Sequence, residues 1–163
     1  MRTKIRLFSR IAMIVLLSLA TFAVHGQTQI NSEAGLRAIA NDLAGEYILT
    51  ADITLTEAWT PIGDNQNRFT GVINGNGKTI YGLKFKDSSL NGAGFVGVAE
   101  GAIIRNLSIA GASIYGGQDV GGIVGLSYAP TTIENCFTSG VFSGWDHVGG
   151  IVGGSKKSDP EGE

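Results

Sequence analysis

Two ten-residue segments decide the fold: Gly116–Gly125 reads GGQDVGGIVG, and Gly144–Gly153 reads GWDHVGGIVG. They are 28 residues apart and identical at seven of ten positions. The tetrapeptide Gly94–Gly97, GFVG, matches the end of both another 28 residues upstream. Self-similarity at a fixed period of this length is typical of solenoids, in which each repeat forms one coil.

The glycines that bound the GFVG and GIVG units are expected to form the corners of the coils. A corner needs either a positive φ angle or a close approach of two backbones, and glycine allows both. The repeat glycines are Gly94, Gly97, Gly122, Gly125, Gly150 and Gly153.

A second motif recurs in Ile80–Phe85, Ile104–Ile109 and Ile133–Thr138, each with Ile first, Gly or Asn third and Leu or Cys fourth. Short β-branched strands between glycine turns predict a parallel β-solenoid whose coils stack about 4.8 Å apart. Equivalent residues then form columns along the stack. The predicted columns are Val120 over Val148, Ile123 over Ile151, Leu107 over Cys136 and an amide ladder of Asn106 over Asn135.

Composition agrees with one ordered, repeat-rich domain. The chain has 163 residues with 25 Gly but only 3 Pro and no G-X-Y period, which excludes collagen and generic low-complexity disorder. Its formal net charge of −2 argues against nucleic acid as a partner, because phosphate binding needs a basic face.

Residues 1–26 have the features of a signal peptide: four basic residues, then 13 almost unbroken apolar residues, then small residues. The apolar segment is shorter than the about 20 residues that span a bilayer. We therefore expect cleavage before Gln27, a secreted or cell-surface location, and no membrane span in the mature chain. Without the four leader cations, 8 basic and 14 acidic side chains remain, a net charge of −6.

The segment 27–45 is expected to form an N-terminal helical cap. Ser32 is a suitable N-cap for a helix over Glu33–Leu43, with Leu36, Ile39, Ala40 and Leu43 on one face. The repeats then occupy residues 46–154, about four coils, and 155–163 is a polar tail that is a possible truncation point. Because that tail has no apolar capping element, we expect end-to-end self-association.

These residues resemble the GLUG-repeat family of exported bacterial surface proteins. The resemblance rests on Tyr47–Ile53, on Trp59 with Pro61–Gly63, on Phe69 with Gly71, on Asn74–Ile80 and on the three G-[FI]-V-G units. It implies an all-β, right-handed parallel β-helix of the kind found in adhesins and in non-catalytic regions of immunoglobulin-A-cleaving metallopeptidases. It implies no catalytic residue.

The sequence contains no recognisable catalytic, cofactor-binding or metal-binding motif. A zinc-peptidase motif needs two histidines one helical turn apart, but the two histidines are His25 and His147. The best candidate ligand-binding surface is a corner with an aromatic platform and polar neighbours. It consists of Trp145, Asp146 and His147, with Asp119 in the adjacent coil, and a glycan or a host or surface protein is the expected partner.

Two functions follow from this reading. The first is a surface-exposed, non-catalytic scaffold or adhesion module. The second is an N-terminal accessory segment of a larger secreted enzyme, a metallopeptidase or a polysaccharide-degrading protein, whose catalytic domain lies outside this chain.

Overall fold

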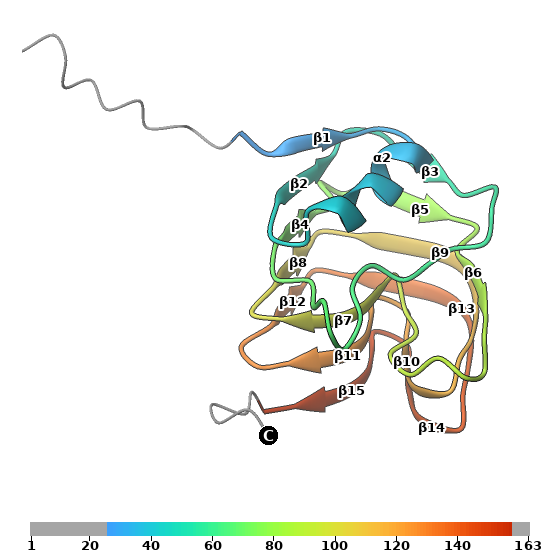
Figure 1. Ribbon diagram of the computed structural model, residues 1–163. Helices are drawn as coiled ribbons and strands as arrows, with labels where there is room; N and C mark the ends of the chain where they lie inside the picture. Colours follow the sequence, from blue (N-terminus) through green and yellow to red (C-terminus); the bar gives the residue numbers. More distant parts are fainter. Residues whose placement is uncertain (1–25, 158–163) are drawn as a thin grey trace, which may run out of the picture.

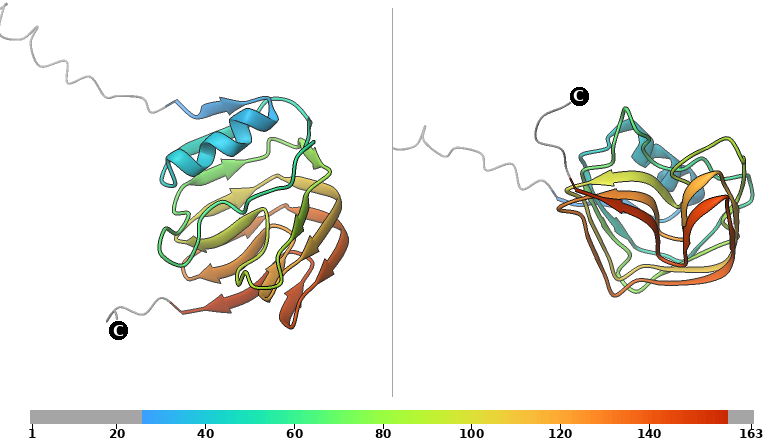
Figure 2. Two further views of the ribbon diagram at one scale, coloured as in Figure 1. Left: turned by 45° about the vertical axis from the view of Figure 1, so that its right-hand side comes forward. Right: turned by 90° about the horizontal axis from the view of Figure 1, so that it is seen from below.

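A parallel β-helix of about four coils forms the body of the protein (Figure 1). The computed structural model describes residues 26–157. The predicted signal peptide, apart from Gly26, and the tail beyond Lys157 lie outside these residues. Seen along the stack, the chain closes around a filled interior (Figure 2).

Two five-stranded sheets, which follow one another in each coil, make up two walls of the stack. The first has the order β1-β2-β4-β8-β12, and the second has the order β13-β9-β5-β3, with β6 also paired to β9. The strands of the first are β1 (Thr28–Ile30), β2 (Glu46–Leu49), β4 (Val72–Asn74), β8 (Ile103–Arg105) and β12 (Thr132–Glu134). Those of the second are β3 (Ile53–Thr54), β5 (Thr79–Tyr81), β6 (Lys84–Lys86), β9 (Ser108–Tyr115) and β13 (Phe137–Ser143).

Two smaller sheets complete the later coils. Their orders are β15-β11-β7 and β10-β14, and all their pairings are parallel. Their strands are β7 (Val96–Glu100), β10 (Gln118–Gly121), β11 (Val124–Tyr128), β14 (Asp146–Gly149) and β15 (Val152–Lys156).

The 28-residue repeat is confirmed as the pitch of these smaller sheets. Val96, Val124 and Val152 are register partners, and so are Val120 and Val148. The amide ladder is confirmed as well: Asn135 Nδ2 donates to Asn106 Oδ1, and Asn106 Nδ2 donates to Asn74 Oδ1, both at 3.3 Å.

The alignment of the second motif was wrong in its first copy. Ile80 pairs with Ile109, whereas Ile104 pairs with Ile73 and Ile133. From β4 onward, each coil contains two strands of similar pattern joined at a corner that contains asparagine. The motif had matched the second strand of one coil to the first strand of the next.

Five of the six repeat glycines allow a close approach of two backbones, and none of the six has a positive φ angle. A Cβ on Gly125 would lie 2.3 Å from the carbonyl carbon of Gly92, and one on Gly122 would lie 2.3 Å from the Gly150 oxygen. The positive φ angles at corners are instead adopted by Asn106 and Asn135, among other residues. Gly150 itself is open, because its nearest neighbour would be Thr138 Oγ1 at 3.7 Å.

The helical cap is confirmed but is shorter than predicted. Ser32 Oγ accepts a hydrogen bond from Gly35 N at 3.2 Å, and the helix α2 (Glu33–Ala38) continues as a 3-10 turn, η1 (Ile39–Asn41). The chain is extended at Asp42, so the helix does not reach Leu43. Leu36 and Ile39 are fully buried against the first coil, whereas Ala40 is exposed.

Within residues 26–157, the core is a set of apolar columns that the helical cap covers at the N-terminal end and that no described residue covers after the last coil. Ile104, Ile114, Val120 and Val124 are at most 1% exposed. Their partners in the last coil, Ile133, Phe142, Val148 and Val152, are half-buried or exposed. The column of Leu107 behaves likewise, because Cys136 is half-buried while Leu107 is fully buried.

Candidate functional site

The predicted corner lies where β10 and β14 stack. Gln118 pairs with Asp146 and Val120 pairs with Val148, so His147 lies directly next to Asp119. His147 Nδ1 is 3.1 Å from Asp119 Oδ1. Both residues have positive φ angles, 51° for His147 and 55° for Asp119.

Asp119 is a buried carboxylate and His147 is its exposed partner. The side chain of Asp119 is 9% exposed and that of His147 is 59% exposed. Asp119 Oδ1 lies against Gly154, where a Cβ would approach it to 2.1 Å. Glycine at position 154 therefore leaves the space that this carboxylate occupies.

Asp146 faces the other ring nitrogen of His147. Its Oδ1 accepts a hydrogen bond from His147 N at 2.9 Å and lies 3.7 Å from His147 Nε2. Asp119 belongs to β10, and Asp146 and His147 belong to β14, so the contact of 3.1 Å between His147 and Asp119 joins two adjacent coils.

Trp145 joins this cluster through its backbone. Its N donates to Gly117 O at 2.8 Å, and its side chain is 73% exposed. The residue next to it in the adjacent coil is a glycine, so no side chain from that position covers the indole. The structure thus brings Asp119, Asp146 and His147 together and presents Trp145 as a bare aromatic surface beside them.

The corner does not extend to a metal centre. Within residues 26–157, no group of three or more His, Cys, Asp or Glu side chains is arranged to hold a metal ion. No helix in this part of the chain is long and apolar enough to cross a membrane.

A groove on another face was missed by the sequence analysis. It measures about 570 Å³ and is lined by Ala58, Lys84, Phe85, Lys86, Ser113 and Tyr115. The alternation Lys-Phe-Lys in β6 is the sequence signal, since it places two ammonium groups on one side of a strand. The pattern predicts this placement of the two lysines only if residues 84–86 are already known to form a strand.

Comparison with known proteins finds two relatives that are much longer than this chain. Halomucin of Haloquadratum walsbyi is 40% identical over 140 residues, a match that covers 77% of this chain but 2% of halomucin. A protein of Evansella cellulosilytica named "Putative Gly-rich membrane protein" is 41% identical over 92 residues, which covers 50% of this chain and 11% of that protein. No protein-family model and no solved structure matches the chain.

Proposed function

We propose that this chain is an exported, non-catalytic β-helix module of the GLUG-repeat type, displayed at the cell surface as a scaffold or adhesion module. The observation that carries the proposal is the 40% identity to a mucin-named protein across most of the chain. The second relative is named as a membrane protein, which supports a surface or membrane-associated location. The leader-like residues 1–26 supply the route of export.

The parallel β-helix suits such a role for a physical reason. Its backbone is fixed by ladders of hydrogen bonds, so the outer side chains keep constant positions along a stiff body. Weak contacts from successive coils then add along one ligand. The exposed indole of Trp145 beside Asp146 and His147 is the contact surface proposed for a glycan or a surface protein.

Location is tested on intact cells that express the full chain. Labelling with a membrane-impermeant biotin reagent should modify this protein but not a cytoplasmic control, and N-terminal sequencing of the labelled form should begin at Gln27. Labelling that requires lysis would overturn the surface location. Retention of residues 1–26 would overturn the proposed cleavage.

Binding at the corner is tested with a glycan array and with whole-cell adhesion. Trp145→Ala should weaken any interaction that the wild-type protein shows. The matched control is Tyr81→Ala, which removes another exposed aromatic side chain, 43% exposed, from a different face. Equal loss in both variants would show that Trp145 is not the specific contact.

The alternative, an accessory segment of a larger secreted enzyme, fits the same comparison because both relatives are far longer than this chain. The two readings differ in chemistry. We expect the purified chain to hydrolyse neither proteins nor polysaccharides. Turnover that is lost on His147→Ala or Asp119→Asn would replace the proposal with an enzyme that uses this corner.

A further inference from the structure

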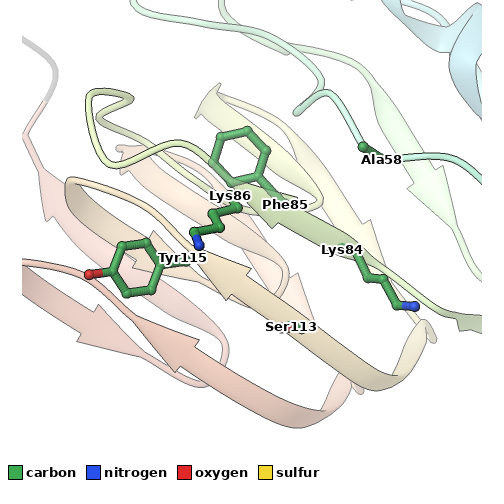
Figure 3. Close-up of a pocket in the computed structure, with 6 residues that line it drawn as sticks. All are labelled: Ala58, Lys84, Phe85, Lys86, Ser113 and Tyr115. Atoms are coloured by element: carbon green, nitrogen blue, oxygen red, sulfur yellow. The ribbon is translucent and has the colours of Figure 1, made fainter.

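The groove beside β6 is a surface of different chemistry from the Trp145 corner. Figure 3 shows Lys84 and Lys86 on one side of β6 and the ring of Phe85 on the other. Phe85 is in register with Ile114 and continues an apolar column, while Lys84 and Lys86 are in register with Ser113 and Tyr115. The two lysines are therefore about 6.6 Å apart along a rigid strand.

Both ammonium groups belong to a sheet without carboxylates. The strands β5, β6, β9 and β13 contain no Asp or Glu, although the chain after residue 26 carries a net charge of −6. Among the described residues, the carboxylates in close contact with a basic side chain contact Arg37, Arg68 or His147, and not Lys84 or Lys86. Lys84 and Lys86 are thus available to an external anion.

The acids that adjoin the groove along the chain are Glu57, next to Ala58, and Asp87, next to Lys86. Asp87 Oδ1 is engaged by its own turn, where it accepts hydrogen bonds from Ser89 N at 2.9 Å and Ser89 Oγ at 2.6 Å. Neither acid is among the residues that line the groove, which carry basic, hydroxyl, aromatic and methyl side chains.

Tyr115 supplies a flat surface at one end of the groove. It is 42% exposed and lies beside its register partner Lys86 (Figure 3). A phenol ring combines an apolar face with a polar edge, which suits the C–H face and hydroxyl groups of a sugar. Ser113 is small and exposed, so the space between the lysines and Tyr115 remains open.

We propose that this groove binds a linear, carboxylate-bearing polysaccharide. Two sugar carboxylates pair with Lys84 and Lys86, and one sugar ring packs on Tyr115. The assignment deepens the proposed function, because it names a ligand class for a module proposed to bind at the cell surface, but it uses a face that is separate from the Trp145 corner.

An acidic peptide fits the groove less well. Peptides that bind to sheets usually add a strand through backbone hydrogen bonds. Here β6 is paired with β9 on one side, and Lys84 O accepts from Trp59 N at 2.8 Å on the other. A peptide would have only side-chain contacts, whereas a polysaccharide needs no backbone partner.

The test is a titration of the purified full chain with polygalacturonate, with dextran as the neutral polymer and poly-glutamate as the acidic peptide. Polygalacturonate should bind in a salt-dependent manner, and dextran should not. The double variant Lys84→Gln/Lys86→Gln should lose about tenfold in affinity, since two charge-assisted contacts are removed. Tyr115→Ala should weaken binding by several-fold.

The controls are matched in charge and in exposure. Lys156→Gln/Lys157→Gln removes the same two charges at the end of β15, and Tyr81→Ala removes a tyrosine that is 43% exposed compared with 42% for Tyr115. Both controls should bind like wild type. An equal loss of affinity in the two double-lysine variants would show that only the net charge of the protein matters, which would contradict a specific site. Tighter binding of poly-glutamate than of polygalacturonate would show that the groove is a peptide site.

No binding of polygalacturonate would overturn the assignment of the groove. That result leaves the proposed surface module untouched, because the module is tested by labelling of intact cells and by Trp145→Ala. Conversely, failure of those tests has no bearing on a titration with purified protein.

Discussion

Asn135 and Asn106, which lie 29 residues apart in the chain, are joined by a side-chain hydrogen bond of 3.3 Å between adjacent coils. Both adopt positive φ angles, 51° and 54°. Asn106 in turn donates to Asn74, so one amide serves as acceptor and donor in the same ladder. Asparagine combines two abilities that this corner needs: it tolerates the left-handed region, and it pairs with copies of itself.

The ladder predicts different costs for two substitutions at Asn106. Asn106→Gly removes two hydrogen bonds but keeps a residue suited to positive φ, and should cost about 1–2 kcal/mol. Asn106→Ala should cost about 1 kcal/mol more, because alanine is strained there. Urea unfolding at neutral pH measures both. Equal costs would mean that the backbone conformation contributes nothing to the choice of asparagine.

Two glycines at equivalent repeat positions should differ strongly in the stability that is lost when each is replaced by alanine. Gly122→Ala places a Cβ 2.3 Å from the Gly150 oxygen of the next coil and should cost more than about 3 kcal/mol or prevent folding. Gly150→Ala, at the same repeat position, meets nothing closer than Thr138 Oγ1 at 3.7 Å and should cost less than about 1 kcal/mol. Thermal melts of the two variants, side by side, check the difference. A severe effect of Gly150→Ala would show that another coil or chain covers that position.

The repeats predicted the columns well because stacking identical coils leaves little freedom in register. Val120 over Val148 and Asn106 over Asn135 follow from the 28- and 29-residue offsets alone. The register of the first coils was harder to predict, because their repeats diverge in sequence. The segment that begins at Ile80 resembles the one that begins at Ile104, yet Ile80 stacks on Ile109. The strand β1 has no repeat partner in sequence, and it is defined only by its pairing with β2.

The candidate corner was predictable for the same reason, and the groove was not. Asp119 and His147 occupy equivalent positions of two repeats, so the sequence already placed them side by side. Lys84 and Tyr115 belong to segments without a shared motif, and their proximity depends on the register of β6 against β9. The extent of burial could not be predicted from the sequence either. Cys136 and Val148 are partly exposed because no described residue packs on the outer side of the last coil.

The hydrogen bonds of Glu33 lead us to expect that the helical cap is held to the first coil less strongly at acidic pH. Its carboxylate accepts hydrogen bonds from Thr56 N at 2.8 Å and from Arg37 Nη2 at 2.6 Å, and these lower its pKa from 4.5 to about 2. A depressed pKa in the folded state means that this stabilisation is present above pH 4.5 and disappears as the pH falls toward 2. Glu33→Gln should therefore lower the urea midpoint at pH 7, and the gap to wild type should narrow below pH 4.5.

Comparison with wild type separates the pH dependence that Glu33 causes from the pH dependence that other acidic residues cause. The pKa values of Asp64 and Asp87 are also lowered, by hydrogen bonds in their own turns, but they titrate equally in both proteins. If the difference in urea midpoint between wild type and Glu33→Gln stays constant from pH 7 to pH 2.5, the charge of Glu33 does not hold the cap to Thr56.

The last coil predicts self-association through its apolar side chains. In the described residues, β12, β13, β14 and β15 lie at the ends of their sheets, so one side of each strand lacks a partner strand. Val148 is 46% exposed, whereas Val120, its partner in the coil above, is fully buried. Unpaired strands next to uncovered apolar columns favour pairing with a second copy. Sedimentation velocity over a range of concentrations should show dimers or larger species at high concentration.

Two lysine substitutions locate the contact. Val148→Lys places a charge in the uncovered column and should shift the protein toward monomer. Val141→Lys adds the same charge at a position that is 69% exposed in β13, in register with Ser113 of the outer face, and should leave the association unchanged. A wild-type protein that stays monomeric at the highest concentration, or an equal response of the two variants, would show that copies do not meet at this end, because a charge in the contact must act more strongly than one outside it.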